Sequence, residues 1–172
     1  IYDIARNEYL LKLQDKYFKN VDKIVAISNE TYNSIVNTYP KYRNKTVIIY
    51  NGYEFDNIIK MAKEKANEKF GIIYCGRLDE NKDPVKLLKI MKIVKEKGYN
   101  FKLAYIGEGI LKQELEDKIA NWNMQDSVKL LGFQNNPYKY MNESKIICMT
   151  SHSEGFPTVI IEGMTLGKPF IS

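Results

Sequence analysis

Apolar positions follow two alternating spacings from Phe70 onward. Short apolar runs of strand length alternate with longer stretches in which apolar residues recur every three or four positions, as on one face of a helix. The expected strands are FGIIYCG, FKLAYIG, SVKLLGF, SKIICMTS and KPFIS, and the helical patterns between them are DPVKLLKIMKIVKEKG, EGILKQELEDKIANWN, PYKYMNE and PTVIIEGMTLG. Strands that alternate with crossover helices predict an α/β fold with a parallel sheet covered on both faces.

The first of these helical patterns has clear boundary residues. Asp83 is suited to cap the helix, Pro84 suits its first position, and Gly98 closes it. In open parallel sheets, ligands bind in the crevice at the carboxyl ends of the strands. We therefore expect the functional residues in the loops that follow the strands.

Residues 1–55 repeat the alternation on a smaller scale. IYDIARNEYLLKLQDKYFKN predicts an amphipathic helix, VDKIVAIS a strand, NETYNSIVNTYP a helix capped by Ser28 or Asn29, and KTVIIYNG a strand. FDNIIKMAKEKANEK predicts a polar helix with little apolar face, which is typical of a connector. We place a domain boundary near residues 52–69, so that residues 1–55 are the tail of a preceding domain and residues 56–172 a second domain, truncated at its C-terminus. The start at Ile1 and the end directly after KPFIS indicate a fragment.

Charge and composition narrow the function classes. The net charge is +5, but the lysines are interleaved with acids, which predicts solvated helix faces; attraction to an anionic membrane surface or an acidic ligand is the alternative. No basic stripe accompanies an aromatic platform, so nucleic acid is not an expected partner. No apolar run approaches the roughly 20 residues that cross a bilayer, and the start does not resemble a signal peptide.

The cysteines indicate buried thiols and not a metal site. Cys75 and Cys148 lie in the apolar runs GIIYCG and KIICMT, which favours buried, reduced side chains. With a single histidine and no paired-cysteine spacing, a protein-built zinc site is not expected, and the cytoplasm is the expected compartment.

The segment 151–169 combines a turn, a helix start and a carboxylate among apolar residues. Pro157 suits the first helical position and Phe156 has no side-chain oxygen for capping, so the first amides are open to a phosphate or to water. Glu162 falls in the second turn of a helix that is apolar almost all round, and we expect it to be buried. A buried carboxylate needs a partner. The two hydroxyls of a ribose would serve, and a salt bridge to a lysine or to Arg77 is the alternative.

Two other strand ends carry candidate ligand-binding turns. Gly76 and Arg77 follow one strand and Lys82 lies five residues beyond Arg77, so two cations could converge on a diphosphate. IGEG, residues 106–109, ends the next strand with glycines that would let a ligand approach the backbone. A dinucleotide-binding motif would need a third glycine where the chain has Lys112, and the next strand ends in LLGF without an acid for a ribose, so NAD is not favoured.

Together these segments resemble a known family. The combination of GRLDENKDP, IGEG, VKLLGF, NPYKYM and SEGFPTVIIEGMTLGKPFIS is similar to the C-terminal, donor-binding half of the retaining GT-B glycosyltransferases of family four, the group 1 transferases. VDKIVAIS and IIYNGYEFD resemble the last strands of that family's N-terminal acceptor domain and its hinge. The most specific motif is a pair of glutamates with seven residues between them after a serine. The resemblance implies a Rossmann-like donor domain, with Gly163 where the family usually has alanine.

The resemblance also implies roles for individual residues. Glu162 matches the glutamate that binds the donor ribose hydroxyls, and Glu154 matches the one beside the transferred sugar, where it positions and stabilises charge. Arg77 and Lys82 match the basic pair that neutralises the diphosphate leaving group in place of a metal, so neither a metal nor a cofactor is expected. The loop and helix start whose amides contact sugar hydroxyls and phosphate correspond to Gly155, Phe156, Pro157 and Thr158. The turn whose backbone reads the base corresponds to Gly132 and Phe133, and Gly76 and Gly107 complete the predicted donor-binding set.

The function implied is transfer of a hexose or N-acetylhexosamine from a nucleotide-diphosphate sugar, with a UDP-sugar favoured over GDP-mannose. The acceptor would be a glycan or lipid-linked saccharide bound by the missing domain, in synthesis of a bacterial surface polysaccharide such as capsule or lipopolysaccharide at the inner face of the cytoplasmic membrane. The fragment alone is expected to be inactive. A non-catalytic nucleotide-sugar-binding or regulatory module and a Rossmann-like oxidoreductase are the alternatives. His152 does not match the family's sugar-site histidine and is expected to be structural or solvent-facing.

Overall fold

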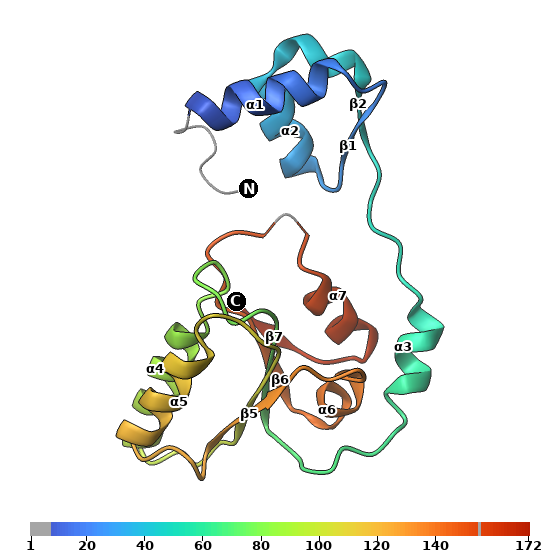
Figure 1. Ribbon diagram of the computed structural model, residues 1–172. Helices are drawn as coiled ribbons and strands as arrows, with labels where there is room; N and C mark the ends of the chain where they lie inside the picture. Colours follow the sequence, from blue (N-terminus) through green and yellow to red (C-terminus); the bar gives the residue numbers. More distant parts are fainter. Residues whose placement is uncertain (1–7, 155) are drawn as a thin grey trace. The chain divides into compact units, whose positions relative to one another are not determined.

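The computed structural model describes residues 8–154 and 156–172, which form two compact units (Figure 1). The first unit runs to Tyr53 and includes residues 153–156; the second comprises residues 54–152 and 157–172. The proposed identity of the first unit as the tail of an acceptor domain stays a prediction.

The first unit is a parallel strand pair with helices. Its elements are α1 (Glu8–Lys19), β1 (Ile24–Ala26), α2 (Asn29–Thr38), the 3-10 helix η2 (Pro40–Lys45) and β2 (Thr46–Ile48). Ser28 caps α2 by accepting a hydrogen bond from the Thr31 amide at 3.1 Å, which selects one of the two predicted caps. The rings of Tyr39 and Tyr42 pack against Phe18 and form the core of this unit.

The second unit is a five-stranded sheet with helices. Its elements in chain order are α3 (Phe55–Met61), β3 (Ile72–Cys75), α4 (Pro84–Glu96), β4 (Leu103–Ile106), α5 (Lys112–Asn121), β5 (Val128–Gly132), α6 (Tyr138–Glu143), β6 (Ile146–Cys148), α7 (Thr158–Thr165) and β7 (Phe170–Ile171). The strand order is β5-β4-β3-β6-β7, and all neighbours pair in parallel.

The direction of the crossovers explains where the helices lie. From β3 the chain steps outward to β4 and β5, and then returns to β6 and β7 on the other side of β3. Because parallel crossovers are right-handed, opposite steps put their helices on opposite faces. Figure 1 shows this arrangement, with α4 and α5 on one face and α3, α6 and α7 on the other. The predicted α/β fold with a parallel, doubly covered sheet is confirmed.

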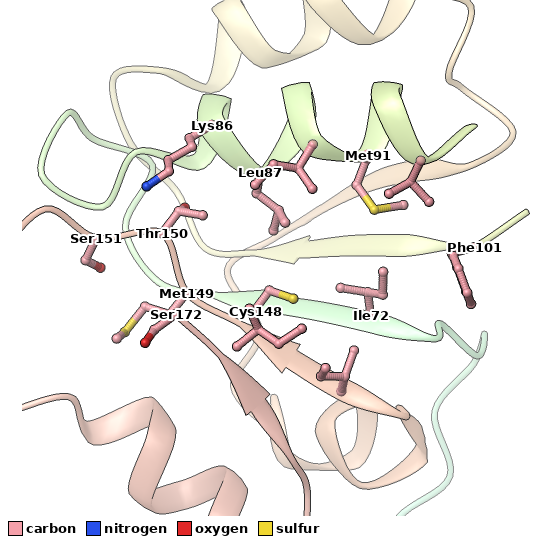
Figure 2. Close-up of a pocket in the computed structure, with 14 residues that line it drawn as sticks. Ile72, Lys86, Leu87, Met91, Phe101, Cys148, Met149, Thr150, Ser151 and Ser172 are labelled. Carbon is pink, nitrogen blue, oxygen red and sulfur yellow. The ribbon is translucent and has the colours of Figure 1, made fainter. Parts of the chain in front are cut away.

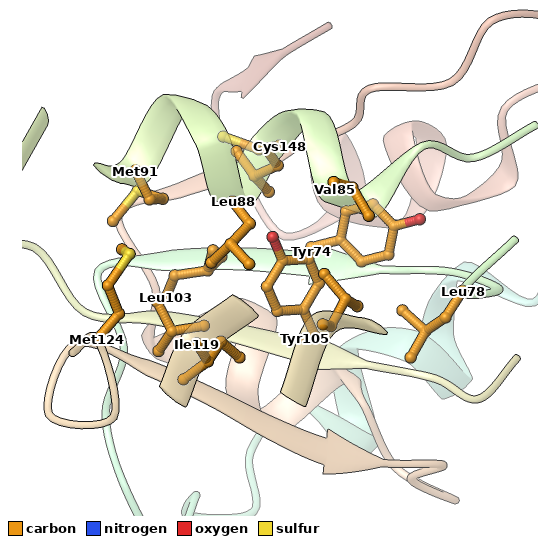
Figure 3. Packing of buried hydrophobic residues seen from close by; sticks show 13 residues of the cluster. Tyr74, Leu78, Val85, Leu88, Met91, Leu103, Tyr105, Ile119, Met124 and Cys148 are labelled. Carbon is orange, nitrogen blue, oxygen red and sulfur yellow. The ribbon is translucent and has the colours of Figure 1, made fainter. Parts of the chain in front are cut away.

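Two apolar clusters hold the helices on the sheet. Under α4 and α5, the rings of Tyr74 and Tyr105 lie with centroids 5.1 Å apart among Leu88, Leu103 and other buried side chains (Figure 3). On the opposite face a second cluster is centred on Ile73, Ala104, Tyr140, Met141 and Ile147. Strands buried on both faces account for their nearly continuous apolar runs.

The helix boundaries agree with the sequence except in three places, one of which is α5, which begins at Lys112 and not at residue 108. Asp83 caps α4, Pro84 is its first residue, and Gly98 follows it at φ +85°, all as predicted. The predicted connector helix is present but shorter than expected: α3 ends at Met61, and its Ile58 is buried within the second unit, where α3 contacts α6 and α7. Beyond Met61 the lysine-rich continuation offers only the small apolar side chains of Ala62 and Ala66 to the core. Pro157 precedes the first residue of α7 and occupies the cap position. None of the described helices is both long and apolar enough to span a bilayer.

Candidate functional site

The carboxyl edge of the five-stranded sheet gathers most of the predicted site residues. Gly76, Arg77 and Lys82 lie in the loop after β3, Gly107 in the loop after β4, and Gly132 and Phe133 at the end of β5. Pro157 and Thr158 lie at the start of α7, which follows β6. The sheet reverses its strand order between β3 and β6, and ligands bind at such switch points in open parallel sheets.

Buried hydroxyls fix the loop after β3. The Tyr74 hydroxyl donates to the Arg77 carbonyl oxygen at 2.9 Å, and the Tyr105 hydroxyl donates to the Pro84 carbonyl oxygen at 2.9 Å. The Thr150 hydroxyl, from the segment after β6, lies 2.7 Å from the Asp83 carbonyl oxygen. Each such bond contributes about 1 kcal/mol and would leave a buried group unpaired if it were lost. The loop that carries Arg77 is therefore held from three directions.

The glycines of IGEG are required by the protein's own backbone. A Cβ at Gly107, where φ is +139°, would lie 2.0 Å from the Gly76 carbonyl oxygen, and one at Gly109 would lie 2.3 Å from that of Leu78. Backbone hydrogen bonds join the loops, with the Leu78 amide donating to the Glu108 carbonyl at 3.0 Å. The packing of the two loops therefore requires both glycines. The predicted approach of a ligand to this backbone stays a prediction.

Gly132 is also confined by its neighbours. It has φ +68°, its carbonyl oxygen accepts the Gly107 amide at 2.9 Å, and an added Cβ would lie 2.8 Å from Glu108 Oε1. The next residue, Phe133, is 72% exposed, so its ring is open at the edge of the sheet. The turns after β3, β4 and β5 thus form one connected backbone structure.

The two predicted cations differ in their surroundings. Arg77 pairs with Asp79 at 3.1 Å, and its side chain is 71% exposed. Asp79 also accepts the Lys82 amide at 3.0 Å, so this carboxylate holds both ends of the turn. Burial is the main cause of the raised pKa of the Cys75 thiol; the charge of Glu162 adds to the rise and the Lys82 ammonium opposes it. Lys82 and Glu162 thus flank the end of β3.

Glu162 was predicted to be buried, and its side chain is partly buried. Its side chain leaves α7 beside the start of α6, where the Tyr138 hydroxyl donates to Oε1 at 3.1 Å. Burial raises the pKa of Glu162, and the bond from Tyr138 lowers it. Within the described ranges no lysine or arginine pairs with Glu162, so the alternative of a salt bridge is not what the structure contains. Arg77 is bound to Asp79 instead.

The cysteines are free thiols. Cys148 is buried as expected, while Cys75 at the end of β3 is only partly covered. Burial, reinforced by the nearby Glu162, raises the pKa of Cys75 to about 12, so this thiol stays protonated at neutral pH. Among the described residues no group of three or more His, Cys, Asp and Glu side chains could hold a metal ion.

The start of α7 has open amides. Among the described residues no side chain caps this helix, and Pro157 in the cap position offers none. The first backbone donor satisfied within the helix is that of Ile160, which donates to the Pro157 carbonyl at 3.1 Å. Open amides at the positive end of a helix dipole suit an anion.

The remaining predicted residues lie elsewhere. Glu154 and Phe156 belong to the first unit, in which the Phe156 ring lies 6.4 Å from that of Tyr50, and Gly155 lies outside the described residues. The structure therefore does not relate Glu154 to Glu162. His152 is exposed and its Nε2 lies 3.2 Å from Asp83 Oδ2 at the cap of α4, in agreement with a structural, solvent-facing residue.

One pocket lies away from these residues. It has a volume of about 340 Å³ between α4 and the strands β3, β6 and β7 (Figure 2). Its walls are mainly apolar, with Leu87, Met91, Phe101 and Cys148 among them, and Lys86 is its charged residue. An apolar wall with one cation does not suit a nucleotide diphosphate, and none of the predicted site residues lines this pocket.

Sequence reasoning missed the tyrosines that organise the site. The sequence pattern placed Tyr74 and Tyr105 in the core of strands and Tyr138 in a short helix. Nothing in that pattern indicated that their hydroxyl groups make structural hydrogen bonds. The partners are 3, 21 and 24 residues away along the chain. The usable signal was that a buried tyrosine normally has a hydrogen-bond partner.

Comparison with known proteins agrees with this architecture. Residues 44–172 match the model of the family described as "Glycosyl transferases group 1". An uncharacterised glycosyltransferase of Methanocaldococcus jannaschii is 34% identical over 172 residues, covering 95% of this chain and 42% of the relative. The N-acetylgalactosamine-N,N'-diacetylbacillosaminyl-diphospho-undecaprenol 4-alpha-N-acetylgalactosaminyltransferase of Campylobacter jejuni is 34% identical over 160 residues, covering 92% of this chain and 42% of the relative.

Solved structures show the same fold. The crystal structure of Anabaena HepE in complex with UDP and glucose superposes with a TM-score of 0.78 at 19% identity, covering 96% of this chain and 48% of HepE. The chain spans about two fifths of the length of the curated relatives it matches, 42% for both of those named above. The family model, the identities and the parallel sheet with its connected carboxyl-edge turns lead to one conclusion: this chain belongs to the group 1 glycosyltransferases and has a GT-B Rossmann-like domain.

Proposed function

We propose that this chain is the donor-binding part of a retaining glycosyltransferase that transfers a hexose or N-acetylhexosamine from a UDP-sugar. The acceptor would be a glycan or a lipid-linked saccharide bound by another part of the protein, in the synthesis of a surface polysaccharide. Residues 1–55 would be the end of the acceptor domain and residues 56–172 the donor domain.

The observation that carries the proposal is the state of the Glu162 carboxylate. It is half-buried in α7, and its polar partner among the described residues is the Tyr138 hydroxyl at 3.1 Å, with no cation paired to it. A carboxylate has about four lone-pair sites, and this bond uses one. The remaining sites can accept the two hydroxyls of a ribose, which need acceptors but bring no charge.

The surrounding groups suit the rest of a nucleotide-diphosphate sugar. Lys82 and Arg77 stand on the loop after β3, where they would neutralise the diphosphate as it leaves. The uncapped start of α7 at Thr158 would supply amides to a phosphate. Gly132 and Phe133 would meet the base at the end of β5. Glu154 would lie beside the transferred sugar as a positioning and charge-stabilising residue.

The chemistry of the transfer then follows from charge. As the bond from the sugar to the diphosphate breaks, negative charge grows on the diphosphate and the sugar carbon becomes oxocarbenium-like. Cations and helix amides held in place before the reaction stabilise that charge without reorganising, which is usually the largest single contribution to catalysis. The loop after β3 is held by buried hydroxyls, which gives Arg77 and Lys82 such a preorganised support.

The relatives support the choice of substrate class. The Campylobacter jejuni relative is named as an N-acetylgalactosaminyltransferase acting on a diphospho-undecaprenol saccharide, and another, from Staphylococcus aureus, as a capsular polysaccharide biosynthesis glycosyltransferase. Anabaena HepE is recorded with UDP and with glucose. These facts favour a UDP-sugar and a lipid-linked or capsular acceptor for the present protein.

Titration with UDP followed by amide chemical shifts tests the proposal. We expect perturbations near residues 76–82 and 156–162 in the folded protein, and a loss of UDP affinity of about 1 to 3 kcal/mol in Glu162→Ala. The matched control is Glu114→Ala on α5, whose carboxylate pairs with Lys118 on the helix surface. Unperturbed amides in both segments, or equal UDP affinity in E162A and the wild-type protein, would reject the assignment.

A further inference from the structure

The hydroxyl of Tyr138 joins two helices at the candidate site. Tyr138 is the first residue of α6, Glu162 lies in the middle of α7, and the hydroxyl donates to Glu162 Oε1 at 3.1 Å. Both side chains are partly buried. Tyr138 was not among the residues expected to bind the donor, so its place at this carboxylate is new information from the fold.

A hydroxyl partner has a different effect from a cationic one. The carboxylate end of a glutamate rotates broadly about its last torsion, and one fixed hydrogen bond restricts that rotation. A lysine or arginine would cancel the charge of Glu162, whereas the tyrosine leaves it intact. Oε2 and the second lone pair of Oε1 then remain as acceptors in a defined direction.

The same bond favours the ionised form of the carboxylate. Burial raises the pKa of Glu162, and the hydrogen bond from Tyr138 opposes that rise. Burial and the adjacent Glu162 raise the pKa of Tyr138 itself to about 12, so the phenol stays a donor at neutral pH. The other titratable group at this position is Cys75 of β3, whose pKa of about 12 keeps it neutral.

Burial and the Tyr138 bond, and not a charged side chain of the helices that pack against α7, are the causes of this pKa shift. These helices are α3 and α6. Their charged residues are Asp56, Lys60, Lys139 and Glu143, and none contributes to the shift in the pKa of Glu162. Tyr138 is thus the polar group that acts on the carboxylate.

We propose that Tyr138 is a positioning residue for donor binding, which holds the Glu162 carboxylate in the orientation that accepts the two ribose hydroxyls. This inference rests on the function proposed above. Tyr138 acts through Glu162 and does not touch the reacting atoms. It extends the donor site from α7 to α6, so the NPYKYM segment takes part in recognition of the nucleotide.

Binding of UDP-glucose by calorimetry tests the inference in the full-length protein. This ligand is chosen because its diphosphate carries no terminal phosphate that would titrate near neutral pH. Tyr138→Phe keeps the ring and removes the hydroxyl, and Tyr140→Phe, two residues along α6 in the core, is the matched control. We expect Tyr138→Phe to bind roughly tenfold more weakly at neutral pH, as for loss of one hydrogen bond to a charged group, and Tyr140→Phe to bind as the wild type does.

A double-mutant cycle separates positioning from a merely structural role. Tyr138→Phe in a Glu162→Ala background should cause no further loss, because the hydroxyl then has no carboxylate to hold. The pH dependence of UDP-glucose binding should also differ between the Tyr138→Phe single variant and the wild type. Without the hydrogen bond the pKa of Glu162 rises, so when the pH is lowered from about 8 to about 5 the variant should lose binding at a higher pH than the wild type does.

The outcomes distinguish this inference from the proposed function. Loss of affinity in E162A together with unchanged affinity and pH profile in Y138F would overturn the role of Tyr138 and leave the donor site standing. An equal loss from Y138F in both backgrounds would also overturn it, since the effect would not pass through Glu162. No effect of E162A on UDP-glucose binding would reject the proposed function itself.

Discussion

Replacing Gly163 by alanine tests the packing of the helix that carries Glu162. Gly163 is buried in α7 directly after that glutamate. A Cβ at this position would lie 2.4 Å from Cδ1 of Ile147, a β6 side chain that is only 1% exposed. The substitution also introduces the alanine that is usual in the family, so the sign of its effect is informative.

Two opposing effects set the magnitude. Alanine in place of glycine within a helix stabilises by about 1 kcal/mol. A contact of 2.4 Å in a packed core requires Ile147 to leave its rotamer or α7 to shift, and such overpacking costs about 1 to 3 kcal/mol. We expect Gly163→Ala to lower the free energy of unfolding by about 1 kcal/mol. Ile147→Val removes Cδ1, and this substitution alone should lower the free energy of unfolding by about 1 kcal/mol.

Urea unfolding of the two single variants and the double variant measures the coupling. The double variant has room for the new methyl group and should regain nearly wild-type stability, which gives a coupling energy of about 2 kcal/mol. Ile73→Val, in the same cluster but without contact to Gly163, is the control and should add to Gly163→Ala without coupling. Additivity of Gly163→Ala and Ile147→Val within about 0.5 kcal/mol would refute the steric reasoning.

Three further predictions concern the loops and the carboxylate. Gly107→Ala should lower the free energy of unfolding by about 3 kcal/mol or more in thermal unfolding, because it adds a backbone clash to a strained φ. Gly98→Ala is the control, since Gly98 has a positive φ but open space around it, and should cost clearly less. Equal losses of stability in the two variants would contradict the contact between the loops. Asp83→Ala should cost about 1 kcal/mol through loss of the α4 cap, measured by urea unfolding, and no loss would argue against that bond. Burial raises the pKa of Glu162 in the folded state, so the wild-type protein loses stability as pH rises through this raised pKa. The stability of Glu162→Gln relative to wild type should therefore increase from about pH 4.5 to about pH 7. A difference in unfolding free energy between the two proteins that stays constant with pH would contradict the shift.

The strand and helix pattern was readable from the sequence because both faces of the sheet are covered. Buried strands give continuous apolar runs, and Asp83, Pro84 and Gly98 mark helix ends through local backbone chemistry that needs no tertiary information. The connector helix was predicted too long because its lysine-rich half has a helical composition but only small apolar side chains to hold it, so α3 ends at Met61.

The candidate site was predictable in position but not in its contacts. Glycines and charged residues after strands pointed to the carboxyl edge, yet the sequence could not tell that Gly107 faces the Gly76 carbonyl oxygen. The partner of Glu162 was also out of reach, because a hydroxyl 24 residues away leaves no periodic signal. A helix that is apolar almost all round suggested burial of Glu162, whereas its side chain is only partly buried beside α6.

Comparison of UDP with 2',3'-dideoxy-UDP tests the central claim, that Glu162 accepts the ribose hydroxyls of the donor. The account predicts that the full-length wild-type protein binds UDP about tenfold or more tightly than the dideoxy ligand, and that Glu162→Ala binds the two almost equally, because the preference lies in hydrogen bonds to the carboxylate. A Glu162→Ala variant that keeps the wild-type preference for UDP would contradict it.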